Sequence, residues 1–460
     1  MKAIPDRDTL VQWLEEKNTE AILDIASEVN PVDFSSSLEE LEPAQIIEIL
    51  SLLDVNLRAE LFSYFSSQKQ LEVFQAWPNR DFAPVLAAMR SNERVDFYQK
   101  LDAEDQKALL PYIDSKTRAD LIHLSSYPRE SAGGIMSTEF QCFRADETID
   151  QVLEKIKSEA PRKKSLYYLY VVDEDLYLVG VLTFRDLLIH PRDTVLRDIM
   201  ISPVVSAQVD DDREVVAQKM EEYNLITLPV TNAKGQIIGV VEHDVAIETI
   251  REEQTEDLQK FMGITREDFD KSYLEISSIE HFKKRISWVT ILAIVGLVSG
   301  FIIHRFENAL ESLLILAFYM PMIADTGGNC GSQSATLVVR ALALQEITVR
   351  DWWRIIFKEL KVALLLGIVL GIIGLLKVLF ISSGLELPSG YSLEKIALVI
   401  AIALALQVIS STLIGALLPL AVKAFGGDPA VAASPMITTV VDITGLLIYF
   451  GLAQLFLGLS

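Results

Sequence analysis

Cysteine is scarce in this sequence: only Cys142 and Cys330 occur among 460 residues. Two cysteines so far apart cannot form a disulfide framework or a thiolate metal site, so we expect the soluble part of the chain to lie in a reducing cytoplasm. Only five histidines occur, and no His/Cys cluster in the hydrophobic runs described below indicates zinc or copper. A glycine-rich phosphate loop with lysine is also missing, which argues against an ATP-driven pump.

Positive charge is in short supply as well. The chain has 41 Lys and Arg against 64 Asp and Glu, a formal net charge of −23. Negative charge repels phosphate backbones, so we expect cationic partners and no nucleic acid. The imbalance is confined to residues 1–280, which carry −25, whereas residues 281–460 carry +2. The two parts therefore suit different environments.

Five long hydrophobic runs fill residues 283–460. Each can cross the roughly 30 Å hydrocarbon core of a bilayer as a helix, so we predict a five-helix transmembrane domain. The runs are 286–303, 313–339, 362–383, 396–422 and 429–460. Nine Lys and Arg flank the ends nearest the N-terminal region, against Arg305 and Lys395 at the other ends. The positive-inside rule then predicts a plasma-membrane protein with cytoplasmic N-terminal domains and an external C-terminus.

The second run departs from a simple hydrophobic helix. It contains Pro321, Gly327, Gly328, Asn329, Gly331 and Gln333. Proline and glycine make a helix easy to bend or open, and irregular backbone at membrane depth survives where it lines water or is packed in protein. The other interpretation is a seam between helices, in which small residues allow close approach and the two amides bond across it. The two interpretations are compatible.

The fifth run contains a single charge, Asp442, about 20 Å along a helix from its start. A carboxylate at such depth costs about 2.5–3.5 kcal/mol on insertion scales, so it should face water or a partner. Helical spacing places Thr438, Thr439 and Gly445 near the same face. One acid with hydroxyl neighbours suits hydrated Mg²⁺. Two chains on a two-fold axis would offer one ion two carboxylates, which favours a homodimer. Alternatively, Asp442 pairs with Lys377 or is protonated.

Residues 1–130 predict an all-α domain of short amphipathic helices, which need neighbours to cover their apolar faces. Examples are 20–29, 43–53, 58–65, 69–76, 82–89, 103–112 and 115–124. No catalytic constellation occurs here, and we expect no enzyme.

Residues 131–250 contain an α/β repeat, in which Gly180 and Gly239 stand 59 residues apart in similar strand-to-helix segments. The region resembles a tandem cystathionine-β-synthase (CBS) domain pair. Nucleotide-binding members hold a ribose with a Thr or Ser and an Asp three residues later, which Thr183 and Asp186 match. The second repeat has Glu242 and Val245 in those places. The resemblance implies at most one nucleotide site, for ATP or a relative of it; the alternative is a purely structural platform.

Acidic residues crowd the links between these segments. Asp211 and Glu214 precede the second repeat, and Glu253, Glu256 and Asp257 follow it on a helical stretch toward the membrane. Such runs are usually solvated surface. With a total of −25, however, divalent ions binding between acidic faces would draw them together, and several sites would have to act jointly to close a gate.

Taken together, the sequence resembles the MgtE-type magnesium channel and transporter family along nearly its whole length. Its most specific motifs are Gly327-Gly328-Asn329 with Gly331 and Gln333, Asp428-Pro429-Ala430, and the stretch from Asp442 to Tyr449. The order is also similar: a helical domain (1–130), a CBS pair (131–250), an amphipathic connecting helix (251–282) and a membrane domain (283–460).

The resemblance implies a homodimer whose pore holds hydrated Mg²⁺ at Asp442 and closes when cytosolic Mg²⁺ fills acidic sites. By position, Glu253, Glu256 and Asp257 match the metal-binding motif of the connecting helix, and Asp428 matches the acid at the cytoplasmic mouth. Ser434 and Thr438 stand where relatives carry Asn and Ala. We therefore predict a passive, gated Mg²⁺ pathway. The alternatives are a CBS-regulated transporter of another ion or solute, and a membrane-anchored cation sensor that does not conduct.

Overall fold

The computed structural model describes residues 4–159, 167–265, 273–274, 276–432 and 434–459. The chain forms two compact units: residues 1–253 with 269–273, and residues 254–268 with 274–460. Helix α15 (His243–Phe261) contributes to both, because its first part belongs to the first unit and residues 254–261 belong to the second.

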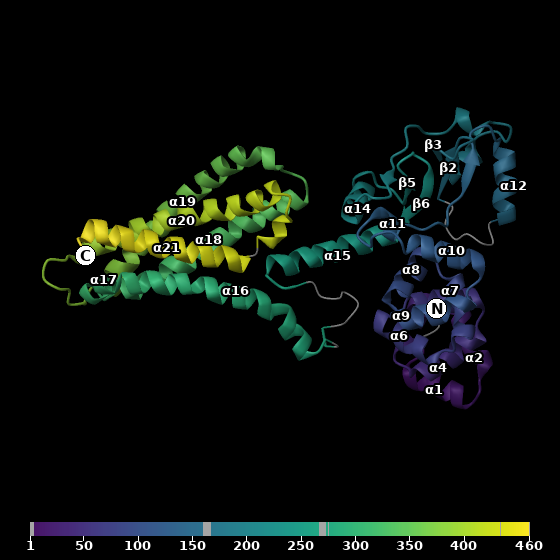
Figure 1. Ribbon diagram of the computed structural model, residues 1–460, viewed down its shortest axis with the longest axis horizontal. Helices are drawn as coiled ribbons and strands as arrows, with labels where there is room; N and C mark the ends of the chain where they lie inside the picture. Colours follow the sequence, from purple (N-terminus) through teal and green to yellow (C-terminus); the bar gives the residue numbers. More distant parts are fainter. Residues whose placement is uncertain (1–3, 160–166, 266–272, 275, 433, 460) are drawn as a thin grey trace. The chain divides into compact units, whose positions relative to one another are not determined.

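The first unit begins with a stack of short helices, as predicted (Figure 1). They are α1 (Arg7–Glu15), α2 (Thr19–Glu28), α3 (Pro31–Glu39), α4 (Pro43–Leu52), α5 (Val55–Ser63), α6 (Ser67–Ala76), α7 (Asn79–Ala88), α8 (Ser91–Lys100), α9 (Ala103–Leu109), η1 (Leu110–Tyr112) and α10 (Ser115–Leu124). Carboxylates start several of them: Asp54, Asp102 and Asp114 each accept two backbone N–H groups of the first turn. Such N-caps satisfy donors that a short helix otherwise leaves unpaired.

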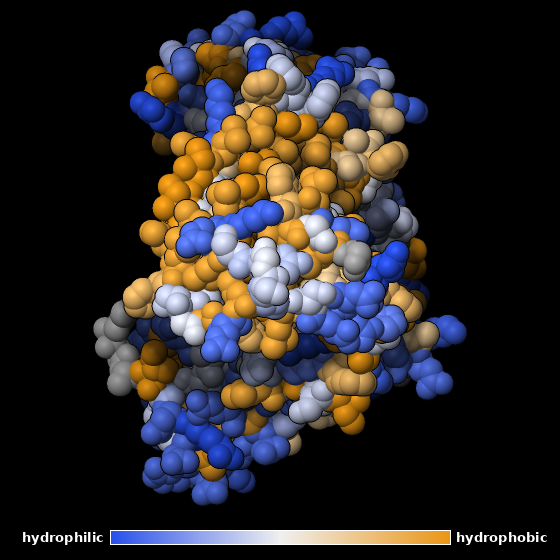
Figure 2. Space-filling view, turned by 90° about the vertical axis from the view of Figure 1, so that its left-hand side faces the viewer, coloured by the Kyte–Doolittle hydropathy of each residue, from blue (hydrophilic) through white to orange (hydrophobic). Residues whose placement is uncertain are grey.

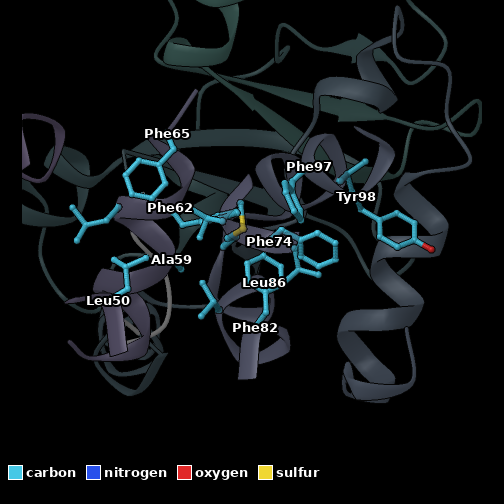
Figure 3. Close-up of a cluster of buried hydrophobic side chains, with 14 of the residues drawn as sticks. Leu50, Ala59, Phe62, Phe65, Phe74, Phe82, Leu86, Phe97 and Tyr98 are labelled. Atoms are coloured by element: carbon cyan, nitrogen blue, oxygen red, sulfur yellow. The ribbon is translucent and has the colours of Figure 1, made fainter. Parts of the chain in front are cut away.

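Aromatic side chains fill the centre of this stack (Figure 3). Phe82 lies edge-on to Phe62 and Phe74, with ring centroids 5.1 and 5.2 Å apart, and Phe97 packs 5.3 Å from Phe62. All four rings are buried. The packing joins α5, α6, α7 and α8, and it explains why such short helices are stable together although none would be stable alone.

The CBS pair follows as two three-stranded sheets with the same topology. In each, the first strand is parallel to the second and the second is antiparallel to the third. The first repeat contains α11 (Ala132–Ile135), β1 (Cys142–Arg144), α12 (Ile149–Glu159), β2 (Tyr168–Val172), β3 (Leu178–Thr183) and α13 (Phe184–Ile189). The second contains η3 (Leu196–Asp198), β4 (Ala207–Gln208), α14 (Arg213–Glu222), β5 (Thr227–Thr231), β6 (Ile237–Glu242) and the start of α15.

The two repeats are packed differently within the first unit. The core of the second repeat is continuous with that of the N-terminal helices, whereas the first repeat has a core of its own. Tyr170 and Val172 of β2 meet Ile237 and Val240 of β6 between the sheets. The N-terminal helices are therefore anchored mainly to the second repeat.

The second unit is a helical bundle. Its helices are α16 (Ser278–Arg305), α17 (Glu307–Ser312), α18 (Ile315–Ala343), η4 (Val349–Asp351), α19 (Trp352–Ile381), α20 (Leu393–Ala424), η5 (Pro429–Val431) and α21 (Ser434–Leu457). Within the described residues, α16, η4 with α19, α20 and α21 are long and apolar enough to cross a membrane. The remaining predicted span corresponds to α18, which has 29 residues but more polar ones. The predicted fold class, an all-α domain followed by a CBS pair and a helical membrane region, is confirmed.

Exposed hydrophobic side chains surround this bundle. Figure 2 shows a broad area of hydrophobic surface on the viewed face. Leu365, Phe380 and Leu455 are 68%, 84% and 74% exposed. A soluble protein rarely exposes so large a contiguous apolar patch, so this surface is suited to lipid. Centrally, α20 packs against α18, α19 and α21.

The aromatic core of the N-terminal helices gives a first prediction. Phe82→Ala removes the ring shared by four aromatic neighbours, and we expect it to lower the free energy of unfolding of these helices by about 3–5 kcal/mol. Hydrogen exchange of residues 31–124 in the full-length protein measures this as lost protection. Tyr112→Ala is the matched control, since Tyr112 is 54% exposed. Equal protection in the two variants would contradict the central role of this ring.

Candidate functional site

Asp442 lies on α21, where that helix packs against α18 and α20. Its side chain is half-buried in the single chain. Among the described residues no ion pair joins it to Lys377, which is exposed on α19. Asp325 of α18 is near enough to act on Asp442 electrostatically. In the part of the chain that the structure describes, no basic side chain forms an ion pair with either carboxylate. Two carboxylates that repel each other at membrane depth in this way favour the binding of a cation.

The glycines of α18 allow the close contact between these helices. A Cβ at Gly328 would lie 3.2 Å from Cγ2 of Thr438, and a Cβ at Gly331 would lie 3.1 Å from the carbonyl oxygen of Ser411. Gly415 of α20 approaches the backbone of Gly331 even more closely. The helix itself is continuous through Pro321 and the glycines. The glycines thus serve the close-packed seam, and the backbone is not opened.

The two amides of that motif lie away from the contact that the glycines make. Asn329 and Gln333 are exposed on the surface of the single chain, as are Asp325 and Thr336. Successive residues of this set are three or four positions apart, so they share one face of α18. The buried face of α18 carries the glycines, and the amides lie on its exposed face. Hydrogen bonding of the two amides across a helix–helix contact therefore stays a prediction.

Hydroxyl groups surround the start of α21. Ser434 Oγ donates to Ser332 Oγ of α18 at 3.0 Å. Thr438 and Thr439 both donate to the carbonyl oxygen of Pro435, at 2.8 and 2.9 Å. A hydroxyl that donates its proton to a carbonyl keeps its lone pairs for another partner. These oxygens can therefore still accept from water or face a hydrated cation.

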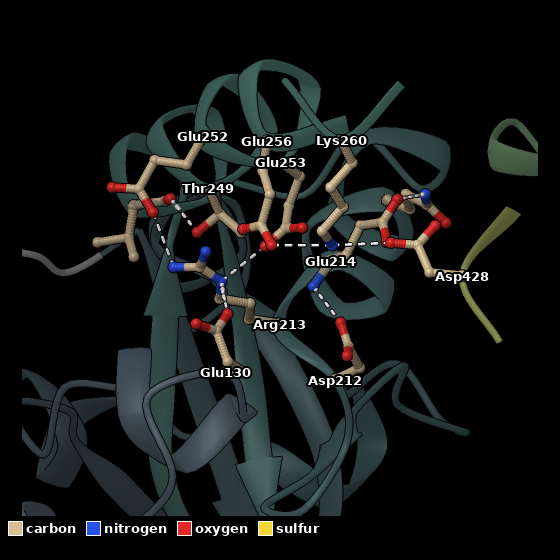
Figure 4. Close-up of polar contacts among 12 residues, drawn as sticks. Glu130, Asp212, Arg213, Glu214, Thr249, Glu252, Glu253, Glu256, Lys260 and Asp428 are labelled. Carbon is tan, nitrogen blue, oxygen red and sulfur yellow. Dashed lines mark hydrogen bonds and ion pairs between the residues drawn. The ribbon is translucent and has the colours of Figure 1, made fainter. Parts of the chain in front are cut away.

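The predicted cytoplasmic mouth is occupied by a lysine. Lys260, near the end of α15, places Nζ 2.7 Å from Asp428 and 2.8 Å from Glu256 (Figure 4). Asp428 also caps η5 by accepting from the backbone N–H of Ala430 at 2.9 Å. Burial, together with the negative charge of Asp428, raises the pKa of Asp257. The last turns of α15, which belong to the second unit, thus place Glu256, Asp257 and the side chain of Lys260 beside the loop that precedes α21.

The other predicted regulatory acids, Glu253, Asp211 and Glu214, lie in the first unit, and Glu253 contacts Arg213. Its guanidinium contacts Glu130, Glu252 and Glu253 at 2.6, 2.7 and 2.8 Å (Figure 4). Burial works against the charge of Arg213, but these three carboxylates outweigh it and raise the pKa. Asp211 accepts from the backbone N–H of Gln208, and Glu214 accepts from Gln218. Across the described ranges, no group of three or more His, Cys, Asp or Glu side chains is arranged to hold a metal ion.

Thr183 and Asp186 are brought together at the start of α13. Thr183 Oγ1 donates to Oδ2 of Asp186 at 2.7 Å, and the backbone N–H of Thr183 bonds the same oxygen at 2.8 Å. They form a capping box, which stabilises the helix start in its own right. At the equivalent place in the second repeat, Glu242 instead contacts Arg90 of the helical domain at 2.9 Å. The equivalent positions of the two repeats thus make different contacts: within the helix start in the first repeat, and with the N-terminal helical domain in the second.

Two features of the site escaped sequence reasoning. Asp325 is a lone charge in the second hydrophobic run, but sequence spacing cannot relate α18 to α21 and so cannot place it near Asp442. Gln407 of α20 lies in an uncharged apolar run, yet it is completely buried beside Gly327 and Gly445. A lone amide inside such a run is the signal that could have identified it, since buried amides need partners.

Comparison with known proteins agrees with this organisation. Residues 320–452 match a family model described as a divalent cation transporter, MgtE. Residues 29–130 match the MgtE intracellular N domain, and 132–193 and 196–250 match the CBS domain.

Similar full-length proteins carry the same family name. The chain is 34% identical to the magnesium transporter MgtE of Thermus thermophilus over 452 residues, covering 98% of both proteins. It is 30% identical to the Bacillus subtilis magnesium transporter MgtE, covering 92% of this chain and 94% of that protein. A crystal structure of the soluble part of a magnesium transporter aligns with a TM-score of 0.51 and 27% identity, over 53% of this chain and 96% of that one. On this sequence agreement across all its domains, the chain belongs to the MgtE family of magnesium transporters.

Proposed function

We propose that this protein conducts Mg²⁺ passively across the plasma membrane, through a pore in which Asp442 contacts the hydrated ion. The observation that carries the proposal is the placement of Asp442: half-buried at membrane depth, close to Asp325 and to hydroxyl groups, and not ion-paired with Lys377. A hydrated dication held by one or two carboxylates and surrounding oxygens matches the way Mg²⁺ is usually bound. Ser434 and Thr438 would then border the ion path through water.

The pore is completed by a second copy of the chain. Asp325, Asn329, Gln333 and Thr336 are exposed on one face of α18. Polar groups on a membrane helix are costly against lipid, so this face requires protein or water opposite it. In a two-fold dimer an isologous contact would cover the same face on both chains and bring their acids toward one axis. The cytoplasmic domains would lie on the side to which the basic loops point, with the C-terminus outside.

Closure would be driven by cytosolic Mg²⁺ at the acids near the mouth. Glu256, Asp257 and Asp428 surround Lys260, and their repulsion is only partly neutralised by that side chain. A divalent ion recruited there would tighten the contact between the end of α15 and the loop before α21. Glu253, Asp211 and Glu214 would contribute through the first unit, since several weak sites together are needed to shift a gate fully. ATP would bind at Thr183 and Asp186 if the capping box opens to it.

Asp442→Asn is the direct test of conduction. The amide keeps the shape of the side chain and removes its charge, so we expect Mg²⁺ flux into proteoliposomes to fall by at least about tenfold, the equivalent of 1.4 kcal/mol. Asp351→Asn, a partly exposed acid in the same unit, is the control and should leave flux unchanged. Normal flux through a folded Asp442→Asn protein would refute the proposal. No flux through the unaltered protein would favour the sensor, and flux of other divalents alone would favour the other-cation transporter.

Lys260→Gln tests the closing site separately. Without the ammonium group the three acids are less compensated, so Mg²⁺ should bind them more readily. The cytosolic Mg²⁺ concentration that halves the flux is then expected to fall by about fivefold, the equivalent of about 1 kcal/mol for a partly exposed ion pair. Lys358→Gln, an exposed lysine of the same unit, serves as the matched control. If Lys260→Gln instead raises this concentration, Lys260 supports the closed state and does not compete with the ion.

A further inference from the structure

Gln407 occupies the contact between the three central helices of the second unit. It lies on α20, about 21 Å from the start of that helix, and its side chain is completely buried. A side-chain amide at such depth is stable only when its polar atoms are hydrogen-bonded. Its partners therefore indicate what it is there to hold.

The amide reaches from α20 to α21. Nε2 of Gln407 donates to the carbonyl oxygen of Val441 at 2.8 Å, and Oε1 accepts from Ser410 at 3.3 Å. The carbonyl group of Val441 belongs to the peptide bond whose nitrogen is that of Asp442. The same carbonyl oxygen also accepts from Thr444 at 3.0 Å. Extra side-chain donors on a helix carbonyl bend and fix the helix locally.

Two glycines make room for this amide. A Cβ at Gly445 of α21 would lie 2.6 Å from Nε2 of Gln407, and a Cβ at Gly327 of α18 would lie closer still. Any larger residue at either position would clash with the side-chain amide of Gln407. The space between α18 and α21 is thus shaped for a single planar group inserted from α20.

We propose that Gln407 is a positioning residue for Asp442. Its hydrogen bond to Val441 fixes the rotation of α21 about its own axis at the turn that presents the acid, and Gly327 and Gly445 are the positions that admit it. Because the amide is neutral, it holds this turn without cancelling the charge of Asp442. The inference rests on the proposed function, in which Asp442 contacts the ion.

Gln407→Leu keeps most of the volume and removes the hydrogen bond. In proteoliposomes we expect the Mg²⁺ concentration for half-maximal flux to rise about threefold to tenfold, the equivalent of one buried hydrogen bond. Maximal flux and the thermal midpoint should change little, because the carboxylate remains present and α20 stays apolar. Thr412→Val is the control: Thr412 is equally buried on α20, but it bonds only its own helix, at Val408.

A second pair of variants separates positioning from general packing. Gly327→Ala places a methyl group where Nε2 lies, so it should raise the half-saturating Mg²⁺ concentration by a similar factor. In a Gln407→Ala background that space is free, and Gly327→Ala should add nothing further. Additive effects of the two changes, or an unaltered half-saturating concentration in Gln407→Leu, would overturn the proposal.

Asp442→Asn is measured alongside to keep the two proposals apart. If it abolishes flux while Gln407→Leu behaves like the unaltered protein, the positioning role fails and the conduction proposal stands. If Asp442→Asn conducts normally, the conduction proposal fails and the positioning proposal fails with it.

Discussion

The carboxyl group of Asp442 is the constraint on which the proposed function of the membrane unit depends. An ionised side chain at this depth must have water, a cation or an opposite charge beside it. This structure places a second carboxylate, Asp325, in its electrostatic range and leaves Lys377 exposed elsewhere. The helices around Asp442 must therefore come close enough to supply oxygen atoms. The glycines of α18 and Gly415 of α20 make that approach possible.

Charge is compensated very differently in the acidic cytoplasmic segments. There, basic side chains are inserted between acids that would otherwise repel one another: Arg213 among three glutamates, Lys260 between Glu256 and Asp428, and Arg90 against Glu242. The net charge of −25 over residues 1–280 thus does not imply unrelieved repulsion at each junction. Any divalent ion that regulates the protein has to compete with, or add to, these tethered cations. Partial neutralisation of this kind keeps the acidic faces together while leaving them attractive to a stronger cation.

Much of the fold could be predicted from local patterns. Amphipathic spacing located seven of the short N-terminal helices, and a repeated strand-turn-strand pattern located both CBS sheets. Helices α1, α3 and α8 lie in the same predicted helical region but outside the seven example ranges. The membrane helices could be located from hydrophobic runs, because a helix that contacts lipid must be apolar over the length that crosses the membrane. These signals are all carried by residues close in the sequence.

The site was less predictable, because its contacts join residues far apart. Asp442 stood out as a lone charge, but neither Asp325 as its neighbour nor Lys260 as the partner of Asp428 follows from spacing: Lys260 and Asp428 are 168 residues apart. The glycines of α18 were noticed, yet their purpose depends on Gln407, which belongs to another helix. Sequence patterns show which face of a helix carries glycines or polar residues. They do not specify which residue of another helix meets it.

The identity of residue 407 illustrates why a neutral group suits this place. A lysine or arginine here could also bond the carbonyl oxygen of Val441, but its charge would pair with Asp442 and reduce the attraction for a cation. A carboxylate could not donate to that carbonyl and would add to the repulsion between Asp325 and Asp442. Leucine would fill the space without a hydrogen bond, so only side-chain packing would hold α21 in its orientation. Packing resists a small rotation of the helix less than a directional hydrogen bond does. An amide combines a fixed donor with no net charge, so in the proposed function it orients Asp442 without competing with the ion for its carboxylate.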